Sequence, residues 1–227
     1  MRKTLVLWDL DGTLCRHNAA FHEQAPLAVA EAAIESGVPL SLAEAVAFAR
    51  ANYPGQKTAI RAFAGRYQLD SEDLFQRYYH HLQPDFLETD PVFCEAVRES
   101  PPWLLHGVLT QAPLVWIEKA LTKLGLWPHF QHDWLLGHER LGRNPKSSAA
   151  AERALAQALE KGDLSPDKVV LIDDRDFILA HYASLARMRI CMGPNESGDQ
   201  TILSADTALQ ALEYVLSGTQ PDGHLAT

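Results

Sequence analysis

Short apolar runs without polar alternation recur along this chain and predict buried β-strands. The first is TLVLW, from Thr4 to Trp8, and comparable runs lie at residues 106–110, 134–136, 169–172 and 187–192. Strands that are apolar on both faces are typical of parallel sheets with helices on each side. We therefore expect these runs to lie next to one another in one sheet.

Stretches with a helical spacing of apolar residues separate the predicted strands. Apolar residues between Leu114 and Leu124 fall on one helix face, and Gly125 is a suitable stop. Residues 147–159 and 205–216 predict two further helices. This alternation predicts an α/β fold of Rossmann-like type, a parallel sheet with helices on both faces.

The region from about residue 14 to residue 100 interrupts the alternation because it contains no convincing strand. Helices are expected there at residues 24–36, 42–52, 57–67, 71–82 and 91–99. Ser41 and Glu44 have the spacing of a capping box, and Asp70 is a suitable N-cap. A helical subdomain is therefore expected as an insertion after the first strand.

The predicted organisation has three parts. Residues 1–14 and 101–218 form an α/β core, residues 15–100 form the helical insertion, and residues 219–227 form a flexible tail rich in Gly, Pro and polar residues. The chain shows no internal repeat, and its 227 residues suffice for one well-packed core with a smaller appendage.

Composition and charge narrow the range of partners. The formal net charge is -9, whereas a nucleic-acid-binding protein usually presents a basic face, so no nucleic-acid partner is expected. No apolar run approaches the ~20 residues that span a bilayer, and the stretch near the N-terminus is too short for a signal peptide. Cys15, Cys94 and Cys191 are too scattered for a disulfide framework or a zinc cluster, so the expected location is the cytoplasm.

Two pairs of carboxylates directly follow two of the predicted strands. Asp9 and Asp11 follow the first strand within DLDGT, and Asp173 and Asp174 follow the strand at 169–172. Because the carboxyl ends of parallel strands meet at one edge of a sheet, both pairs are expected at one site. A surface turn is the alternative reading of DLDGT, but it does not explain two acids placed against a fully apolar strand.

These four carboxylates would repel one another without a cation, and oxygen ligands suit Mg²⁺. One carboxylate of the first pair can attack an electrophile while the other transfers a proton. Asp176, two positions after the second pair, either joins this group or caps the next helix.

Two single polar residues complete the candidate site. Thr110 ends the predicted strand at 106–110, and its hydroxyl can donate to a phosphate oxygen. Lys146 precedes a predicted helix, where an ammonium group could neutralise a phosphate and a nucleophile together. Either residue taken alone fits an ordinary structural role, so its significance depends on the acidic pairs.

The order Asp-x-Asp-Gly-Thr, Thr, Lys and Asp-Asp resembles the haloacid dehalogenase superfamily from Thr4 to about Leu216, and the insertion resembles its helical cap of the first type. The resemblance implies a Mg²⁺-dependent phosphatase acting on a small phosphorylated molecule. Asp9 would form an aspartyl-phosphate, and Asp11 would protonate the leaving group and then activate water. Thr110 and Lys146 would hold the phosphoryl oxygens.

The same resemblance implies a magnesium site made by Asp9, the backbone carbonyl of Asp11 and the second acidic pair, with Asp174 preferred over Asp173. Substrate contacts are expected from Thr110 and Lys146, and also from Gln111, Arg16 and His17. Gln111 stands where Asn or Asp is commoner, Lys146 lacks the frequent second proline, and Phe177 replaces an expected acid.

Several alternatives share part of this pattern. A haloalkanoate dehalogenase usually lacks the second acid of the first motif, so Asp11 argues against it. A sugar-phosphate mutase uses the same framework, and a phosphate-binding module without catalysis also stays open. A receiver domain would have the acidic pair first and no large insertion. A dinucleotide site has little support because no G-x-G-x-x-G follows the first strand. The oligomeric state is not indicated.

Overall fold

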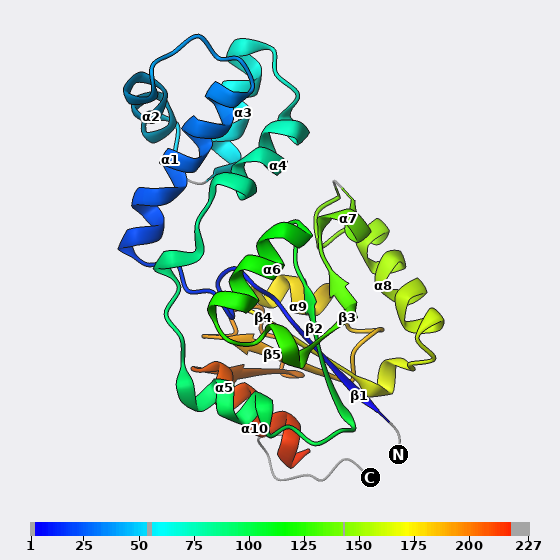
Figure 1. The fold of residues 1–227 in the computed structure, drawn as a ribbon. Helices are drawn as coiled ribbons and strands as arrows, with labels where there is room; N and C mark the ends of the chain where they lie inside the picture. The colour runs from blue at the N-terminus through cyan, green and yellow to red at the C-terminus, as the bar shows by residue number, and fades with distance from the viewer. Residues whose placement is uncertain (1–2, 54–55, 143, 219–227) are drawn as a thin grey trace. The chain divides into compact units, whose positions relative to one another are not determined.

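The computed structural model of this protein describes residues 3–53, 56–142 and 144–218, which form two compact units (Figure 1). Unit 1 comprises Met1–Arg16 and Glu88–Thr227, and unit 2 comprises His17–Leu87. The predicted tail at residues 219–227 lies outside the described residues. In the described parts of the chain, no helix has both the length and the apolar character needed to cross a membrane.

Unit 1 is built on a six-stranded parallel sheet with the order β3-β2-β1-β4-β5-β6. The strands are β1 (Thr4–Trp8), β2 (Leu104–Leu109), β3 (Phe130–Leu136), β4 (Val169–Asp173), β5 (Met188–Met192) and β6 (Ile202–Ala205). The fully buried β1 lies between β2 and β4, which confirms the predicted α/β class. Strand β6 was not predicted, because four residues with an exposed Ser204 make a weak strand signal.

The helices of unit 1 cover both faces of the sheet. They are α5 (Pro91–Arg98), α6 (Leu114–Lys123), α7 (His138–Leu141), α8 (Ala149–Lys161), α9 (Asp176–His181) and α10 (Ala208–Ser217), with 3₁₀ turns η2 (Trp127–His129) and η3 (Pro166–Lys168). On one face Leu7 shares a core with Leu155 of α8 and Leu179 of α9. On the other, the indole of Trp8 packs edge-on against Phe93 of α5, with ring centroids 5.3 Å apart.

Unit 2 is helical and consists of α1 (Ala19–Glu35), α2 (Leu42–Ala51), α3 (Gln56–Tyr67), α4 (Ser71–His81) and the 3₁₀ turn η1 (Pro84–Phe86). Helix α1 contacts the other three α-helices. Ser41 and Glu44 form the predicted capping box, and Asp70 caps α4. Helix α1 begins five residues before the predicted residue 24, because Asn18 accepts a hydrogen bond from the Phe21 amide.

Helix α5 belongs to unit 1, whereas the predicted insertion extended to residue 100. Its apolar face is buried there, with Phe93 against Trp8 and the Cys94 thiol donating to the carbonyl of Leu124. It also contacts α10. These contacts end the helical unit at Leu87.

His106 of β2 is a buried polar residue that links Trp8, which packs against α5, to Ser100. Its Nδ1 accepts a hydrogen bond from Trp8 Nε1 at 3.2 Å, and its Nε2 lies 3.0 Å from Ser100 Oγ. The side chain is 2% exposed. Burial, with the nearby charge of His129 as a second cause, lowers the pKa of His106 to about 4. The folded protein therefore holds this imidazole neutral.

We expect this neutral imidazole to make the protein acid-sensitive. The folded-state pKa of about 4 lies below the ordinary 6.5, so the stabilisation is complete above pH 6.5 and is lost as pH falls towards 4. The full loss is about 3 kcal/mol. Between pH 7 and pH 4.5 the wild type should therefore lose unfolding free energy that His106→Gln does not lose. The difference between the two proteins, measured by urea unfolding, should become smaller as pH falls.

An exposed histidine on β3, His132, provides the control. His132→Gln should run parallel to the wild type over the same pH range. A His106→Gln variant that also runs parallel would show that the imidazole is not held neutral.

Candidate active site

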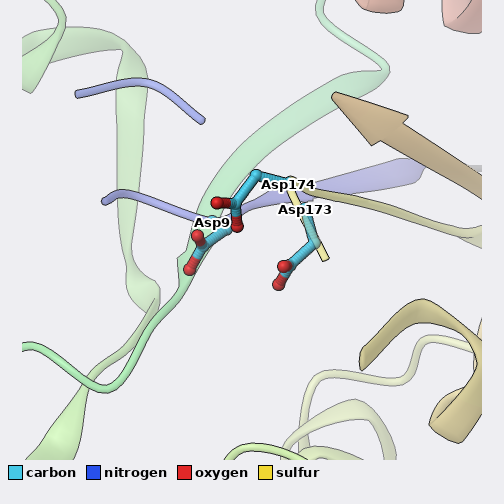
Figure 2. A group of neighbouring side chains, drawn as sticks. All are labelled: Asp9, Asp173 and Asp174. Carbon is cyan, nitrogen blue, oxygen red and sulfur yellow. The ribbon is translucent and has the colours of Figure 1, made fainter. Parts of the chain in front are cut away.

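The carboxyl ends of β1 and β4 bring three carboxylates together (Figure 2). Asp9 follows β1 directly, and its amide donates to the carbonyl of Ile172 in β4 at 2.8 Å. One oxygen each from Asp9, Asp173 and Asp174 lies within 4.8 Å of the other two. The adjacency of β1 and β4 in the sheet therefore places the two acidic pairs at one site.

The buried Lys146 connects two of these carboxylates. Its Nζ donates to Asp9 Oδ1 at 2.6 Å and also to Asp173 Oδ2. The lysine is 2% exposed, and its backbone carbonyl accepts a hydrogen bond from the Tyr182 hydroxyl at 2.6 Å. Burial opposes the charge of this ammonium, but the two carboxylates outweigh burial and raise the pKa of Lys146. Lys146 is therefore a buried cation rather than a surface lysine.

The electrostatics of Asp9 are unfavourable without a further cation. Burial raises the pKa of Asp9 to about 7, Lys146 opposes this effect, and Asp173 adds to it. Burial and the charge of Asp173 likewise raise the pKa of Asp174. A divalent cation would relieve both effects by favouring the ionised carboxylates.

Two buried carboxylate oxygens at the site have no hydrogen-bond partner within the described parts of the chain. They are Asp9 Oδ2 and Asp174 Oδ1. Gly12 allows Asp174 to approach, because a Cβ at Gly12 would lie 2.3 Å from Asp174 Oδ2 and the residue has φ +98°. Both oxygens of Asp173 are used, by Lys146 and by the Arg175 amide at 2.9 Å. The donor set therefore fits a hard cation such as Mg²⁺, with Asp9 and Asp174 as its available ligands.

Asp11 is held by an indole that we did not predict as part of the site. Trp116 of α6, fully buried, donates through Nε1 to Asp11 Oδ1 at 3.1 Å. The turn carrying Asp11 is closed by the Cys15 amide, which donates to the carbonyl of Leu10 at 2.7 Å. Asp11 is thus fixed at the end of β1 in a half-buried position.

Thr110 follows β2 and is buried, 2% exposed. Its amide donates to the carbonyl of Leu136 at 3.0 Å, and its hydroxyl oxygen accepts from the Ala112 amide at 3.2 Å. This contact does not use the hydroxyl hydrogen, which can still donate to another acceptor. The side-chain amide of Gln111 donates to the carbonyl of Asn144 at 3.0 Å, on the loop that leads to Lys146.

Arg16 and His17 are the other predicted substrate residues, and each is held by contacts within its own unit. The exposed Arg16 donates from Nη2 to the carbonyl of Asp206 at 3.1 Å, within unit 1. His17 belongs to unit 2, where its ring stacks on Phe21 with centroids 3.9 Å apart. Asp176 is separate from the carboxylate cluster, because its Oδ2 accepts from the Glu196 amide at 2.7 Å.

Sequence reasoning missed Trp116, Tyr182 and Arg175. The first two contact the site from helix α6 and from the residue after α9, where their apolar surroundings gave them the pattern of core residues. Arg175 could have been identified, since it is a charged residue directly after Asp174. Its Nε lies 3.5 Å from Oδ1 of both Asp173 and Asp174.

Several solved structures of other proteins are similar to this chain. Neither a protein-family model nor a curated protein sequence matches the chain. Among similar solved structures is a proposed phosphoglycolate phosphatase from Lactobacillus plantarum, with a TM-score of 0.60 and 17% identity, covering 94% of this chain and 99% of that chain. The proposed hydrolase YfnB from Bacillus subtilis, bound to magnesium, has a TM-score of 0.61 and 17% identity, covering 96% and 100%.

A proposed beta-phosphoglucomutase from Thermotoga maritima is also similar, with a TM-score of 0.59 and 16% identity, covering 96% of this chain and 100% of that chain. Dehalogenases are similar as well, with TM-scores from 0.51 to 0.54. At these identities the similarity concerns the fold, and the structures carry several activities. This chain has the fold of the haloacid dehalogenase superfamily hydrolases, which confirms at the level of the fold the resemblance found in its motifs.

Proposed function

We propose that this protein is a Mg²⁺-dependent phosphomonoester hydrolase that acts on a small phosphorylated molecule through an aspartyl-phosphate on Asp9. The observation that carries the proposal is the state of Asp9. One of its oxygens contacts the buried Lys146, and the other, Oδ2, is buried without a hydrogen bond; one Asp9 oxygen also lies within 4.8 Å of an Asp174 oxygen. Such a carboxylate suits attack on phosphorus, because Lys146 and a bound metal ion would balance its charge.

Each nearby group has a role in this scheme. The Asp9 carboxylate would attack phosphorus, the ester oxygen would leave, and Asp11 would give that oxygen a proton and later take one from water. Trp116 orients Asp11 for this transfer. Lys146 would neutralise charge on the phosphoryl oxygens, and the Thr110 hydroxyl would donate a hydrogen bond to one of them. Gln111 supports the loop that carries Lys146.

Asp9, the carbonyl of Asp11 and Asp174 would hold Mg²⁺, with Asp173 occupied by Lys146 and Arg175. When bound, the ion supplies positive charge that draws the phosphoryl group and the nucleophile together. The two buried carboxylate oxygens that have no hydrogen bond, Asp9 Oδ2 and Asp174 Oδ1, support this assignment.

We propose unit 2 as a cap that selects the substrate, with His17 at its start; Arg16, on the adjoining core, stays a candidate substrate residue. A cytoplasmic location and the absence of nucleic-acid and membrane partners stay predictions. A dehalogenase needs no proton-transferring acid at Asp11, so the fixed Asp11–Trp116 pair favours the phosphatase. A mutase or a binding module would retain the same core residues, and the assay below distinguishes both from a phosphatase.

Hydrolysis of 4-nitrophenyl phosphate tests the proposal directly. We expect phosphate release with Mg²⁺ and at least about a 100-fold lower rate after chelation, because charge neutralisation supplies much of the catalysis. Mg²⁺ at about 100 times its Kd should also stabilise the fold by roughly 2.7 kcal/mol, measured by thermal unfolding.

Asp174→Asn should lose both effects, whereas Asp176→Asn, an acid outside the cluster, should keep them. A mutase would transfer phosphate without releasing it, and a binding module would show only the thermal shift. Absence of phosphate release and of any Mg²⁺-dependent shift would contradict the proposal.

A further inference from the structure

Arg175 brings a partly exposed cation to the rim of the carboxylate cluster. It follows Asp174 directly, and its amide donates to Asp173 Oδ1 at 2.9 Å, which fixes the turn at the end of β4. Its Nε lies 3.5 Å from one oxygen of each aspartate. The side chain is 39% exposed, in contrast to 1% for Lys146. Lys146 is therefore buried within the site, whereas Arg175 is partly exposed at its edge.

Among the residues that the structure describes, only the Nε edge of the Arg175 guanidinium makes polar contacts. The contacts above involve Nε, and within the described parts of the chain Nη1 and Nη2 have no hydrogen-bond partner. The planar group lies over the ring of Phe177, 5.9 Å from its centroid, and Phe177 is itself 55% exposed. A guanidinium supported in this way presents a two-pronged donor that matches carboxylate and phosphate oxygens.

We propose that Arg175 binds a second anionic group of the substrate, a carboxylate or a second phosphate, joined to the reacting phosphoryl group by a short linker. This inference rests on the proposed function and adds to it a substrate class, a phosphomonoester that carries a further anion. Arg175 is then a specificity-determining residue, and Phe177 positions it.

The charges of the site favour a second group over the reacting phosphoryl group. Lys146 already contacts Asp9 and Asp173, and Mg²⁺ would take over the charge of Asp174, which leaves the charge of Arg175 for the substrate. Arg175 Nε lies 3.5 Å from Asp174 Oδ1, and one oxygen each of Asp174 and Asp9 lies within 4.8 Å of the other, so a short linker can separate the two anions. Its side chain is partly exposed, so it is accessible to a group of the substrate that does not react at the buried nucleophile.

A matched pair of substrates tests this assignment. 3-(Phosphonooxy)propanoate and propyl phosphate differ in the carboxylate, and propane-1,3-diol bisphosphate replaces the carboxylate by a second phosphate. For the wild type we expect kcat/KM to be higher for at least one of the two substrates with a second anionic group than for propyl phosphate. Arg175→Gln should lower that preference about 30-fold, mainly through KM, because one bidentate pair is lost. Arg175→Lys should restore part of it.

The preference is a ratio between two substrates on one enzyme, so effects of the substitution on Mg²⁺ binding or stability cancel. Each variant is assayed at saturating Mg²⁺. Arg153→Gln, an exposed arginine on α8, removes the same charge away from the site and should leave the preference unchanged. A larger loss for one of the two substrates with a second anionic group identifies the group that Arg175 binds.

Equal losses for all three substrates would overturn the assignment, because Arg175 would then act on the reacting phosphoryl group or the metal. An unchanged preference would overturn it as well. Binding of 4-phosphonobutanoate against butylphosphonate, which cannot be hydrolysed, gives a second readout by calorimetry. An Arg175-dependent preference there without turnover of any ester would sink the proposed function alone, whereas turnover without that preference would sink the inference about Arg175 alone.

Discussion

Replacing Asp9 by Asn is expected to lower kcat for phosphomonoester hydrolysis by more than about 10⁴-fold while leaving the fold intact. The amide cannot attack phosphorus, and it removes one of the two buried carboxylate oxygens that have no hydrogen bond at the proposed metal site. It keeps an oxygen that can accept from Lys146 Nζ, now 2.6 Å from Asp9 Oδ1. Because Lys146 also retains Asp173, the buried ammonium does not lose its countercharge.

Two measurements separate loss of the nucleophile from loss of structure. The metal-free variant should unfold in a single transition close to that of the wild type, because the buried carboxylate it removes is itself unfavourable, with a pKa raised to about 7 by burial. Rapid acid quenching with a ³²P-labelled substrate should give labelled protein for the wild type and none for Asp9→Asn. Near-normal turnover in the variant would refute the covalent scheme.

The acidic strand ends were predictable because two simple signals coincide in the sequence. An apolar run such as Thr4–Trp8 marks a strand buried on both faces, and adjacency in a parallel sheet brings its end next to that of another such strand. The meeting of Asp9 with Asp173 and Asp174 needs only that β1 and β4 be neighbours. No detail of side-chain packing enters this argument.

The contacts that refine the site depend on packing, which sequence patterns do not encode. Trp116 lies 105 positions after Asp11, and its spacing is that of a core residue. The apolar face of helix α5 does not reveal its partner in the sequence, and its contacts with Trp8, Leu124 and α10 assign it to unit 1. The preference for Asp174 as the available ligand similarly depends on which oxygens of Asp173 are already used.

Lys146 links folding and chemistry, because one buried cation balances two buried carboxylates. Its Nζ contacts Asp9 and Asp173, and with the lysine gone both acids would stay buried without that charge. Breaking a buried ion pair by removing one partner typically costs about 3–5 kcal/mol. We therefore expect Lys146→Met to lower the unfolding free energy of the metal-free protein by about that amount, and kcat/KM by about 10³-fold.

A double variant decides whether unpaired charge is the cause. The double variant Lys146→Met with Asp9→Asn removes one of the two carboxylates that have lost their countercharge. It should therefore regain a large part of the stability lost by Lys146→Met, while staying inactive. Lys161→Met, an exposed lysine at the end of α8, is the matched control and should unfold like the wild type. Urea unfolding without metal measures all four proteins. If the double variant were no more stable than Lys146→Met, the loss would come from packing around the lysine stem, and the two carboxylates would not depend on Lys146 for their burial.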